Sequence, residues 1–420
     1  MTSGLELDAP APGAPRPAAP VPSWHGVDPT QPDPARWNDP FPSLRALRER
    51  FPVHPTPAGL WRIYRYRDVA RVLRELPAGV RLRDGSLASN AMGGGGPSGG
   101  EFMLQQDPPN HTRLRKLVSK AFTPRATESW RPRAREITRA LLAPALEAGE
   151  IELVSGLAQP LPSQLICEML GVPVADRDRF AAWTAVGTHI LRGPFLTPEQ
   201  RGQVEAALLA LAGYFQALIA ERRSALGDDL LSELIRAEAE GERLRPDELL
   251  VQCMGLLAAG FETTIGLIAL GAKLLADHPE QCARLRAEPG RIAAAVEECL
   301  RFEGPVGMTT RVLHADAEIG GQRIPADTTL WLSLWAANRD PEHFADPDRF
   351  AIERAPNDHL AFGGGTHHCL GAHLARMEAQ EALGALVAGT RSFERHERSI
   401  AWGPSLFRVP ARVPLRLDRA

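Results

Sequence analysis

Apolar residues recur at helical spacing along most of the chain from Phe41 onward. An apolar side chain that returns every three or four residues predicts an amphipathic helix, and the clearest such segments are residues 42–50, 127–147 and 198–224. A longer apolar segment runs from about Pro246 to Asp277 and stops before Pro279, so at about 1.5 Å per residue it predicts a helix on the order of 45 Å long. Strand-like runs are short: residues 60–64, 329–334 and 411–417. The pattern therefore predicts a mainly helical fold with small β-sheets.

Two segments lack this pattern. Residues 1–40 are rich in proline and alanine, and they cannot bury enough apolar surface to offset the entropy of ordering. They predict a disordered or extended leader before a single domain of residues 41–420. Residues 91–100 contain six glycines. No Gly-Lys-Ser/Thr follows them, which argues against a phosphate-binding loop and favours a mobile loop at 93–100 of the kind that gates ligand access.

Composition and charge argue against several classes of protein. The formal net charge is −3, whereas a nucleic-acid-binding protein would usually carry a basic domain or stripe. Five cysteines are scattered without a CxxC pair, which argues against a disulfide framework or a multi-cysteine metal site. No segment reaches 18 uncharged apolar residues, and no basic start with an apolar run opens the chain. We therefore expect no membrane span, no signal peptide and a cytoplasmic location.

The strongest chemical signal is the segment FGGGTHHCLG, residues 362–371, which precedes an apolar helix. Its glycines permit positive φ angles and close approach of a flat ligand to the backbone. Backbone N–H groups and the helix N-terminus would favour the thiolate of Cys369, which can then bind iron.

Three other interpretations of this cysteine compete. A buried structural cysteine is the commonest case, but it does not need a glycine on both sides. A zinc site made of His367, His368 and Cys369 is unfavourable, because three adjacent residues cannot easily converge on a tetrahedral ion. A catalytic cysteine with a histidine base is possible, although nothing else in the chain supports it.

The spacing Phe-x-x-Gly-x-x-x-Cys-x-Gly resembles the haem-binding loop of the cytochrome P450 family, in its soluble bacterial class. The resemblance runs from about Trp37 to the C-terminus, and the leader and the glycine-rich loop are its main departures. It implies the P450 fold, a triangular helical prism around a buried haem b, with Cys369 as the axial ligand of the iron. Haem contacts are then expected from the loop and the helix after it, through Phe362, Gly363, His367, Cys369 and Gly371.

Further motifs occur in the order that the family shows. Asp107 is predicted to cap a helix whose first turn holds Pro108 and Pro109, and His111 and Arg115 share one face of it. Alone such a pair is more often solvated, but in the family it holds a haem propionate, as do the residues that match Arg311 and His367. The long helix carries Ala259-Gly-Phe-Glu262-Thr263-Thr. On its own, this break in the apolar pattern is also explained by a glycine that packs against another helix and a glutamate that is ion-paired. By resemblance to the family, Ala259 and Gly260 lie against the haem, and Glu262 and Thr263 deliver protons to oxygen.

Two charged motifs are expected to support the fold. Glu298 and Arg301 lie three residues apart on one helix face, and Arg349 follows in the segment Phe344–Phe350. In the family the matching glutamate and two arginines form a buried ion network beneath the cysteine loop. Candidate substrate contacts are apolar: Leu256, Ala259, Val306, Met308, Leu406 and Phe407.

The resemblance implies a haem-thiolate monooxygenase that uses O2 and two electrons to hydroxylate or epoxidise a small molecule. The apolar candidates predict an apolar or amphipathic substrate of the fatty-acid, terpenoid, steroid or polyketide (macrolide) type. The sequence holds no flavin or iron–sulfur motif, so electrons are expected from a ferredoxin or flavodoxin with its reductase. Arg113, Lys116, Lys120 and Arg125 are candidates for the docking face, although such a charge run is often merely solvated. A peroxide-using peroxygenase or a non-catalytic haem sensor is the alternative, and the Glu262–Thr263 pair argues against both.

Overall fold

The computed structural model describes residues 38–57, 59–87, 102–187, 189, 196–239, 245–397, 399–402 and 407–420. Most of the predicted leader, the whole of the glycine-rich segment 91–100 and the pocket candidate Leu406 therefore lie outside the described residues.

Helices make up most of the described chain. The α-helices are α2 (Phe41–Arg50), α3 (Tyr66–Arg74), α4 (Asn110–Ser119), α5 (Pro124–Ser129), α6 (Arg131–Ala148), α7 (Pro160–Met169), α8 (Arg177–Gly187), α9 (Pro198–Ser224), α10 (Leu230–Ala239), α11 (Pro246–Asp277), α12 (Pro279–Ala287), α13 (Ile292–Glu303), α14 (Leu334–Ala337) and α15 (Ala372–Gly389). Shorter turns are η1 (Met103–Gln105), η2 (Lys120–Phe122), η3 (Val154–Ala158), η4 (Val174–Asp176), η6 (Pro289–Arg291) and η7 (Gly365–His367). The mainly helical fold predicted from the apolar spacing is confirmed.

Within the described ranges, ten short strands form three sheets. The largest has the order β1-β2-β8-β5-β3, in which only β2 and β8 are parallel. The others are the sheet β4-β10-β9 and the hairpin β6-β7. The strands are β1 (Val53–Pro55), β2 (Trp61–Ile63), β3 (Ala78–Gly79), β4 (Glu150–Glu152), β5 (Met308–Leu313), β6 (Ala317–Ile319), β7 (Gln322–Ile324), β8 (Thr329–Ser333), β9 (Thr390–Arg395) and β10 (Pro414–Arg419).

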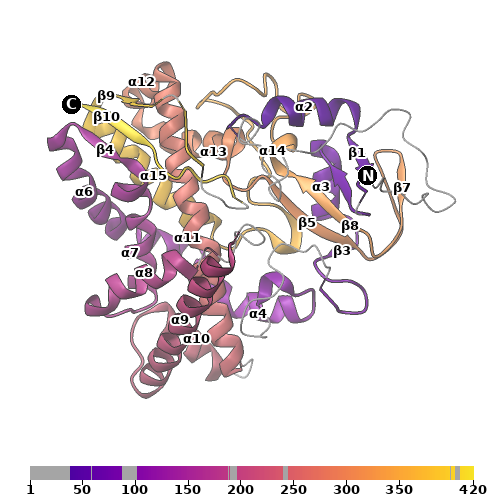
Figure 1. Cartoon of the computed structure of the whole chain (residues 1–420), viewed down its shortest axis with the longest axis horizontal. Coiled ribbons are helices and arrows are strands. Elements are labelled where there is room, and N and C mark those ends of the chain that lie inside the picture. The colour runs from indigo at the N-terminus through magenta and orange to yellow at the C-terminus, as the bar shows by residue number, and fades with distance from the viewer. Residues whose placement is uncertain are drawn as a thin grey trace, which may run out of the picture.

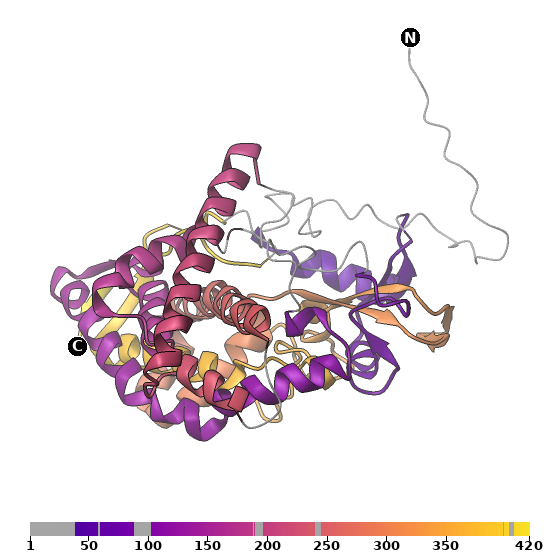
Figure 2. The ribbon, with the colours of Figure 1, turned by 90° about the horizontal axis from the view of Figure 1, so that it is seen from below.

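The molecule has a helical side and a sheet side. Figure 1 shows most helices gathered on one side and the five-stranded sheet on the other. Helix α11 is seen almost end-on near the middle of the molecule in Figure 2. Its bounds, Pro246–Asp277, are those predicted from the apolar run, with a proline in the first turn and Pro279 opening the next helix.

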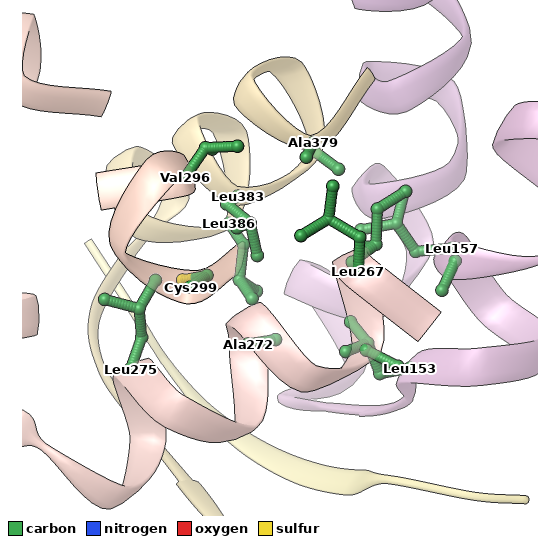
Figure 3. Close-up of a cluster of buried hydrophobic side chains, with 14 of the residues drawn as sticks. Leu153, Leu157, Leu267, Ala272, Leu275, Val296, Cys299, Ala379, Leu383 and Leu386 are labelled. Atoms are coloured by element: carbon green, nitrogen blue, oxygen red, sulfur yellow. The ribbon is translucent and has the colours of Figure 1, made fainter. Parts of the chain in front are cut away.

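The main core packs around α11. Leu267 and Ala272 of α11 face Leu157 of η3, Cys299 of α13 and Leu383 of α15 in a single buried cluster (Figure 3). A Cβ added at Gly271 would lie 2.7 Å from the Leu383 Cδ1 atom, so a glycine lets α15 approach α11 closely. The cluster fixes α15, whose N-terminal end carries the cysteine loop, against the central helix.

Two helices, α9 and α11, are long and apolar enough to cross a membrane by length and composition alone. Core helices of soluble proteins pass the same test, and 56% of the apolar window in α11 is buried inside the protein. These helices are therefore weak support for a membrane span.

The structure corrects three details of the prediction. The helix expected at 127–147 is two helices, α5 and α6, because a proline in the first turn of α6 cannot continue the hydrogen bonding of α5. Asp107 does not cap α4; its carboxylate instead accepts hydrogen bonds from the backbone N–H groups of Val80 and Arg81. The last strand is β10, which begins three residues later than the run at 411–417.

Candidate active site

The loop before α15 holds Cys369 in a fixed backbone turn. The Cys369 N–H donates to the Phe362 carbonyl oxygen at 3.0 Å. Gly363 and Gly365 have φ angles of 68° and 66°, in the left-handed region that favours glycine. A Cβ at Gly365 would also overlap the Leu73 carbonyl oxygen of α3. The glycines predicted to shape this loop are therefore required by its backbone and by its contact with α3.

Cys369 differs from the other cysteines in its accessibility. It is exposed, whereas Cys167, Cys253, Cys282 and Cys299 are buried. Protein groups behind it still desolvate the sulfur, and this burial raises the pKa of the Cys369 thiol, although the Gly371 N–H and the charge of Arg115 lower it. A metal ion at the open side would deprotonate such a thiol. Cys369 is thus the cysteine that a ligand can reach.

Four groups that can carry positive charge gather beside this loop: His111 and Arg115 of α4, Arg311 of β5, and His367. The His111 and His367 ring centroids are 4.2 Å apart. Burial, helped by His367 and Arg115, lowers the pKa of His111 to about 4. Burial also lowers the pKa of Arg311 to about 10. The negative charge of Asp107 opposes both shifts but does not outweigh burial.

The hydrogen bonds of this cluster are incomplete. His111 Nδ1 and both ring nitrogens of His367 are buried without a hydrogen-bond partner. Arg311 donates to the Thr310 carbonyl oxygen at 2.7 Å, and within the described ranges neither it nor Arg115 forms an ion pair. The nearest carboxylate, Asp107, lies 3.7 Å from His367 Nε2. Buried polar groups normally have partners, so the cluster fits an anionic ligand with more than one carboxylate.

Helix α11 presents an open surface in its middle. Ala259 and Gly260 are exposed although they belong to the central helix, and a Cβ at Gly260 would have no atom within 4 Å. One turn further on, the Thr263 hydroxyl donates to the Ala259 carbonyl oxygen at 2.8 Å. Such a bond competes with the helix ladder and opens it locally. Glu262 is 9% exposed beside it, so an acid and a hydroxyl lie next to a space that a flat ligand can fill.

These features together fit a haem. The accessible Cys369 sulfur can take the iron, the surface at Gly260 can take the ring, and the orphaned imidazole nitrogens with Arg115 and Arg311 can take the two propionates. The residues predicted for these contacts come from α4, α11, β5 and the loop before α15.

A buried ion pair supports the segment that leads to the loop. Arg301 donates to both oxygens of Glu298 at 2.7 Å, and both side chains are 0% exposed. Arg301 also donates to the carbonyl oxygens of Asn338 and Pro347. The pair predicted from the three-residue spacing is present.

The third member of this network is corrected by the structure. The Arg349 side chain is 61% exposed and pairs with Glu353, and only its carbonyl oxygen meets Arg301. Arg354 takes the expected place, with its Nε 3.2 Å from each Glu298 oxygen and a side chain that is 10% exposed. The turn after Phe350 directs Arg354, and not Arg349, inward.

A second ion pair behind the loop escaped the sequence analysis. Arg376 of α15 donates to both oxygens of Glu297 at 2.7 and 2.8 Å, and its guanidinium lies 4.5 Å from the centre of the Phe362 ring. Burial raises the pKa of Glu297, but hydrogen bonds from His359 and Arg376 outweigh it and lower that pKa to about 2. The pair holds the residue whose carbonyl accepts the Cys369 N–H. The sequence signal for this pair was an arginine near the start of the helix that follows the cysteine loop.

The residues predicted to line the substrate pocket pack against different hydrophobic clusters. Leu256 of α11 packs on the cluster formed by α4, α8, α9 and α10. Val306 packs on both the main core and the sheet core, and Met308 is half-buried at the start of β5. Phe407 is 9% exposed and belongs to the main core.

Known proteins resemble this chain over most of its length. Residues 189–394 match the Cytochrome P450 family. The chain is 42% identical to the cytochrome P450 monooxygenase PikC of Streptomyces venezuelae, over 83% of each chain. It is 38% identical to the vitamin D(3) 25-hydroxylase of Pseudonocardia autotrophica, over 87% of this chain and 89% of that one. The myxobacterial cytochrome P450 CYP267B1 in complex with myristic acid superposes with a TM-score of 0.80 at 38% identity, covering 92% of this chain and 98% of that one.

Proposed function

The chain belongs to the cytochrome P450 monooxygenase family, and on that premise we propose that it hydroxylates or epoxidises an apolar or amphipathic small molecule. The observation that carries this proposal is the accessible Cys369 at the end of a glycine loop, close enough to Arg115 for that charge to lower the pKa of its thiol. The apolar side chains Leu256, Val306, Met308 and Phe407 support the substrate class. A 6-deoxyerythronolide B hydroxylase, a vitamin D(3) 25-hydroxylase and a P450 in complex with myristic acid, all similar to this chain, support the same class.

The family implies a haem-iron cofactor, which we propose is haem b. When bound, haem supplies the iron at which O2 is activated. The Cys369 thiolate would hold that iron and donate electron density that favours O–O cleavage. Arg115, Arg311, His111 and His367 would bind the propionates, and that negative charge would favour the protonated imidazoles.

Glu262 and Thr263 supply protons in this proposal. The Thr263 hydroxyl donates to the Ala259 carbonyl oxygen in the structure, so its own oxygen can still accept a hydrogen bond. Glu262 is the adjacent acid on the same helix. Proton delivery by a positioned side chain typically contributes a factor of about 10² to 10⁴ to a rate.

A Thr263→Ala variant tests the proton supply. Without the hydroxyl, we expect product formed per electron consumed to fall by on the order of 10-fold or more, with hydrogen peroxide rising in its place. Thr264→Ala is the matched control, since the neighbouring Thr264 is 5% exposed and buried in the protein. Product yield and peroxide are measured for both variants. Equal coupling in Thr263→Ala and the parent would contradict the assignment.

The substrate class is tested by absorbance titration of the haem-loaded protein. Fatty acids, terpenoids, steroids and macrolides are added, and displacement of water at the iron shifts the Soret band. We expect a response to at least one of these classes. A response only to small charged molecules would contradict the proposal.

Electrons require a separate partner, for which we propose a ferredoxin or flavodoxin with its reductase. Lys116, Lys120 and Arg125 are exposed near α4 and support a basic docking face. Arg113 contributes less, because it pairs with the buried Glu248 at 2.5 Å. An open cavity of about 640 Å³ beside Lys116 adds accessible surface there. Reduction rates by a ferredoxin should fall as salt rises; a salt-independent rate would contradict this face.

We also propose a cytoplasmic location. All five cysteines are free, as is usual in a reducing compartment.

A further inference from the structure

Glu303, Arg408 and Lys273 form a buried ion cluster. None of the three is among the residues proposed for proton supply or for contact with the haem. Glu303, the last residue of α13, accepts hydrogen bonds from Arg408 Nη2 at 2.7 Å and Arg408 Nε at 3.0 Å. Lys273 of α11 donates to its other oxygen at 3.0 Å. The side chains of Glu303 and Arg408 are 4% and 1% exposed.

The charges of this cluster depend on one another. Burial raises the pKa of Glu303, but the neighbouring charges of Arg408 and Lys273 outweigh it and lower that pKa to about 2. The glutamate is therefore ionised at neutral pH. Removing one member would leave a buried charge without its partner, which is strongly unfavourable.

The cluster joins three walls of the proposed substrate pocket. Glu303 stands just before Pro305 and Val306, which lead into β5. Arg408 follows Phe407 directly, and its backbone N–H donates to the Pro305 carbonyl oxygen at 2.8 Å. A backbone hydrogen bond and an ion pair thus connect the segment before β5 with the C-terminal turn, which is residues 407–409.

Helix α11 forms the third wall and contacts both the segment before β5 and the C-terminal turn. A Cβ at Gly266 would be 2.7 Å from Pro305 Cβ and 3.2 Å from Val409 Cγ2, so the glycine admits the two segments to the face of α11. The same helix carries Thr263 one turn earlier. A displacement of the C-terminal turn would therefore change the space between Phe407, Val306 and the reacting centre.

Arg408 is also anchored on its outer side. Its Nη2 donates to the Asn38 carbonyl oxygen at 2.9 Å, and its guanidinium lies 3.7 Å from the centre of the Trp402 ring. Trp402 Nε1 in turn donates to Asn38 Oδ1 at 2.5 Å. These contacts hold the guanidinium in one orientation, which lysine cannot reproduce because it has a point charge on a flexible stem.

We propose that the Glu303–Arg408 pair is a positioning element that sets the distance between Phe407 and Val306 and thereby the length of ligand that the pocket accepts. This inference rests on the proposed function, since it concerns the pocket of that same site. Glu303 and Arg408 touch no reacting atom; they act through Phe407, Pro305 and Val306. A purely structural role would lower stability without changing the preference among ligands.

Arg408→Lys is the principal variant, because it keeps the positive charge beside Glu303 and loses the forked hydrogen bonds and the contact with Trp402. Glu303→Gln is the second variant, which keeps the shape and removes the negative charge. Arg222→Lys is the matched control. Arg222 of α9 is 15% exposed and donates to Asp229 Oδ2 at 2.7 Å and to the Gly171 carbonyl oxygen at 2.8 Å, and neither contact involves Glu303 or the C-terminal turn.

The haem-loaded proteins are titrated with 1-methyl-, 1-butyl-, 1-octyl- and 1-dodecylimidazole, whose ring binds iron while the alkyl chain probes the pocket. We expect Arg408→Lys and Glu303→Gln to change the ratio of the 1-dodecyl to the 1-methyl dissociation constant by on the order of 10-fold, the size of effect that one or two methylene contacts produce. The 1-methylimidazole constant and the ratio in Arg222→Lys should stay within about 2-fold of the parent.

The outcomes separate this inference from the proposed function. Normal binding of 1-methylimidazole with an unchanged ratio in both cluster variants would overturn the inference alone, as would an equal change in Arg222→Lys. Absence of any imidazole response in the parent protein would overturn the haem site, and the inference with it.

Discussion

Replacing Cys369 with serine is expected to abolish substrate oxidation and remove the spectroscopic signature of thiolate ligation. A serine hydroxyl has nearly the same size, but it does not ionise as a thiol does beside a metal ion. The loop geometry should survive, because it rests on Gly363, Gly365 and the Cys369 N–H bond to Phe362, none of which involves the sulfur. The effect should therefore fall on the iron and not on the fold. Product formation and the spectrum of the reduced, carbon-monoxide-bound protein measure it.

Cys167→Ser is the control for this experiment. Cys167 of α7 is buried in a hydrophobic cluster with residues of α4, α8 and α9. This burial raises the pKa of its thiol to about 12. It cannot serve as a readily formed thiolate, so its loss should leave the spectrum and the product unchanged. Retained oxidation in Cys369→Ser, or loss of the thiolate spectrum in Cys167→Ser, would show that the iron ligand has been misassigned.

The largest effect on stability is expected for Arg301→Met. This substitution leaves Glu298 fully buried with Arg354 and Asn357 as its polar side-chain partners among the residues that the structure describes. Breaking a buried ion pair from one side costs on the order of 3–5 kcal/mol, and the remaining Arg354 contact favours the lower end of that range. The free energy of unfolding is measured by urea denaturation.

Arg349→Met provides the comparison, because it removes the same charge from a side chain that is 61% exposed. Surface substitutions of this kind usually change stability by less than about 0.5 kcal/mol. Equal losses in the two variants would place Arg349 in the network after all and contradict the arrangement around Glu298.

Local relations between residues were predictable, and relations across the fold were not. The bounds of α11 follow from one continuous apolar run between Pro246 and Pro279. Glu298 and Arg301 share one helix turn, so their spacing is sufficient to pair them. The third partner depends on how the chain turns after Phe350, and both Arg349 and Arg354 fit the charge pattern of that segment. Side-chain direction in an irregular turn is set by packing that a sequence pattern does not contain.

The same distinction explains the other corrections. Asp107 has the composition of a helix cap, but Gly79 leaves room for its carboxylate at the end of β3, where the backbone N–H groups of Val80 and Arg81 bind it. Glu303 and Arg408 are 105 residues apart in the chain. No local pattern connects them, and only the folded structure shows that the start of β5 and the C-terminal turn share a buried ion pair.

The candidate site contains both kinds of relation, one that the local sequence predicts and one that only the fold creates. His111 and Arg115 lie four residues apart on α4, so their common face was predictable from the helix alone. Arg311 and His367 joined them only through the resemblance to a known family. Their shared burial, which lowers the pKa of both His111 and Arg311, is a property of the assembled structure.

The central claim is that Cys369 holds the iron of a haem, and the absorption spectrum of the purified protein, reduced and bound to carbon monoxide, tests it most directly. A Soret band at the long wavelength typical of thiolate ligation is the predicted result. A Soret band at the shorter wavelength of histidine ligation, or a protein that takes up no haem, would contradict the assignment of Cys369 and the monooxygenase mechanism that depends on it.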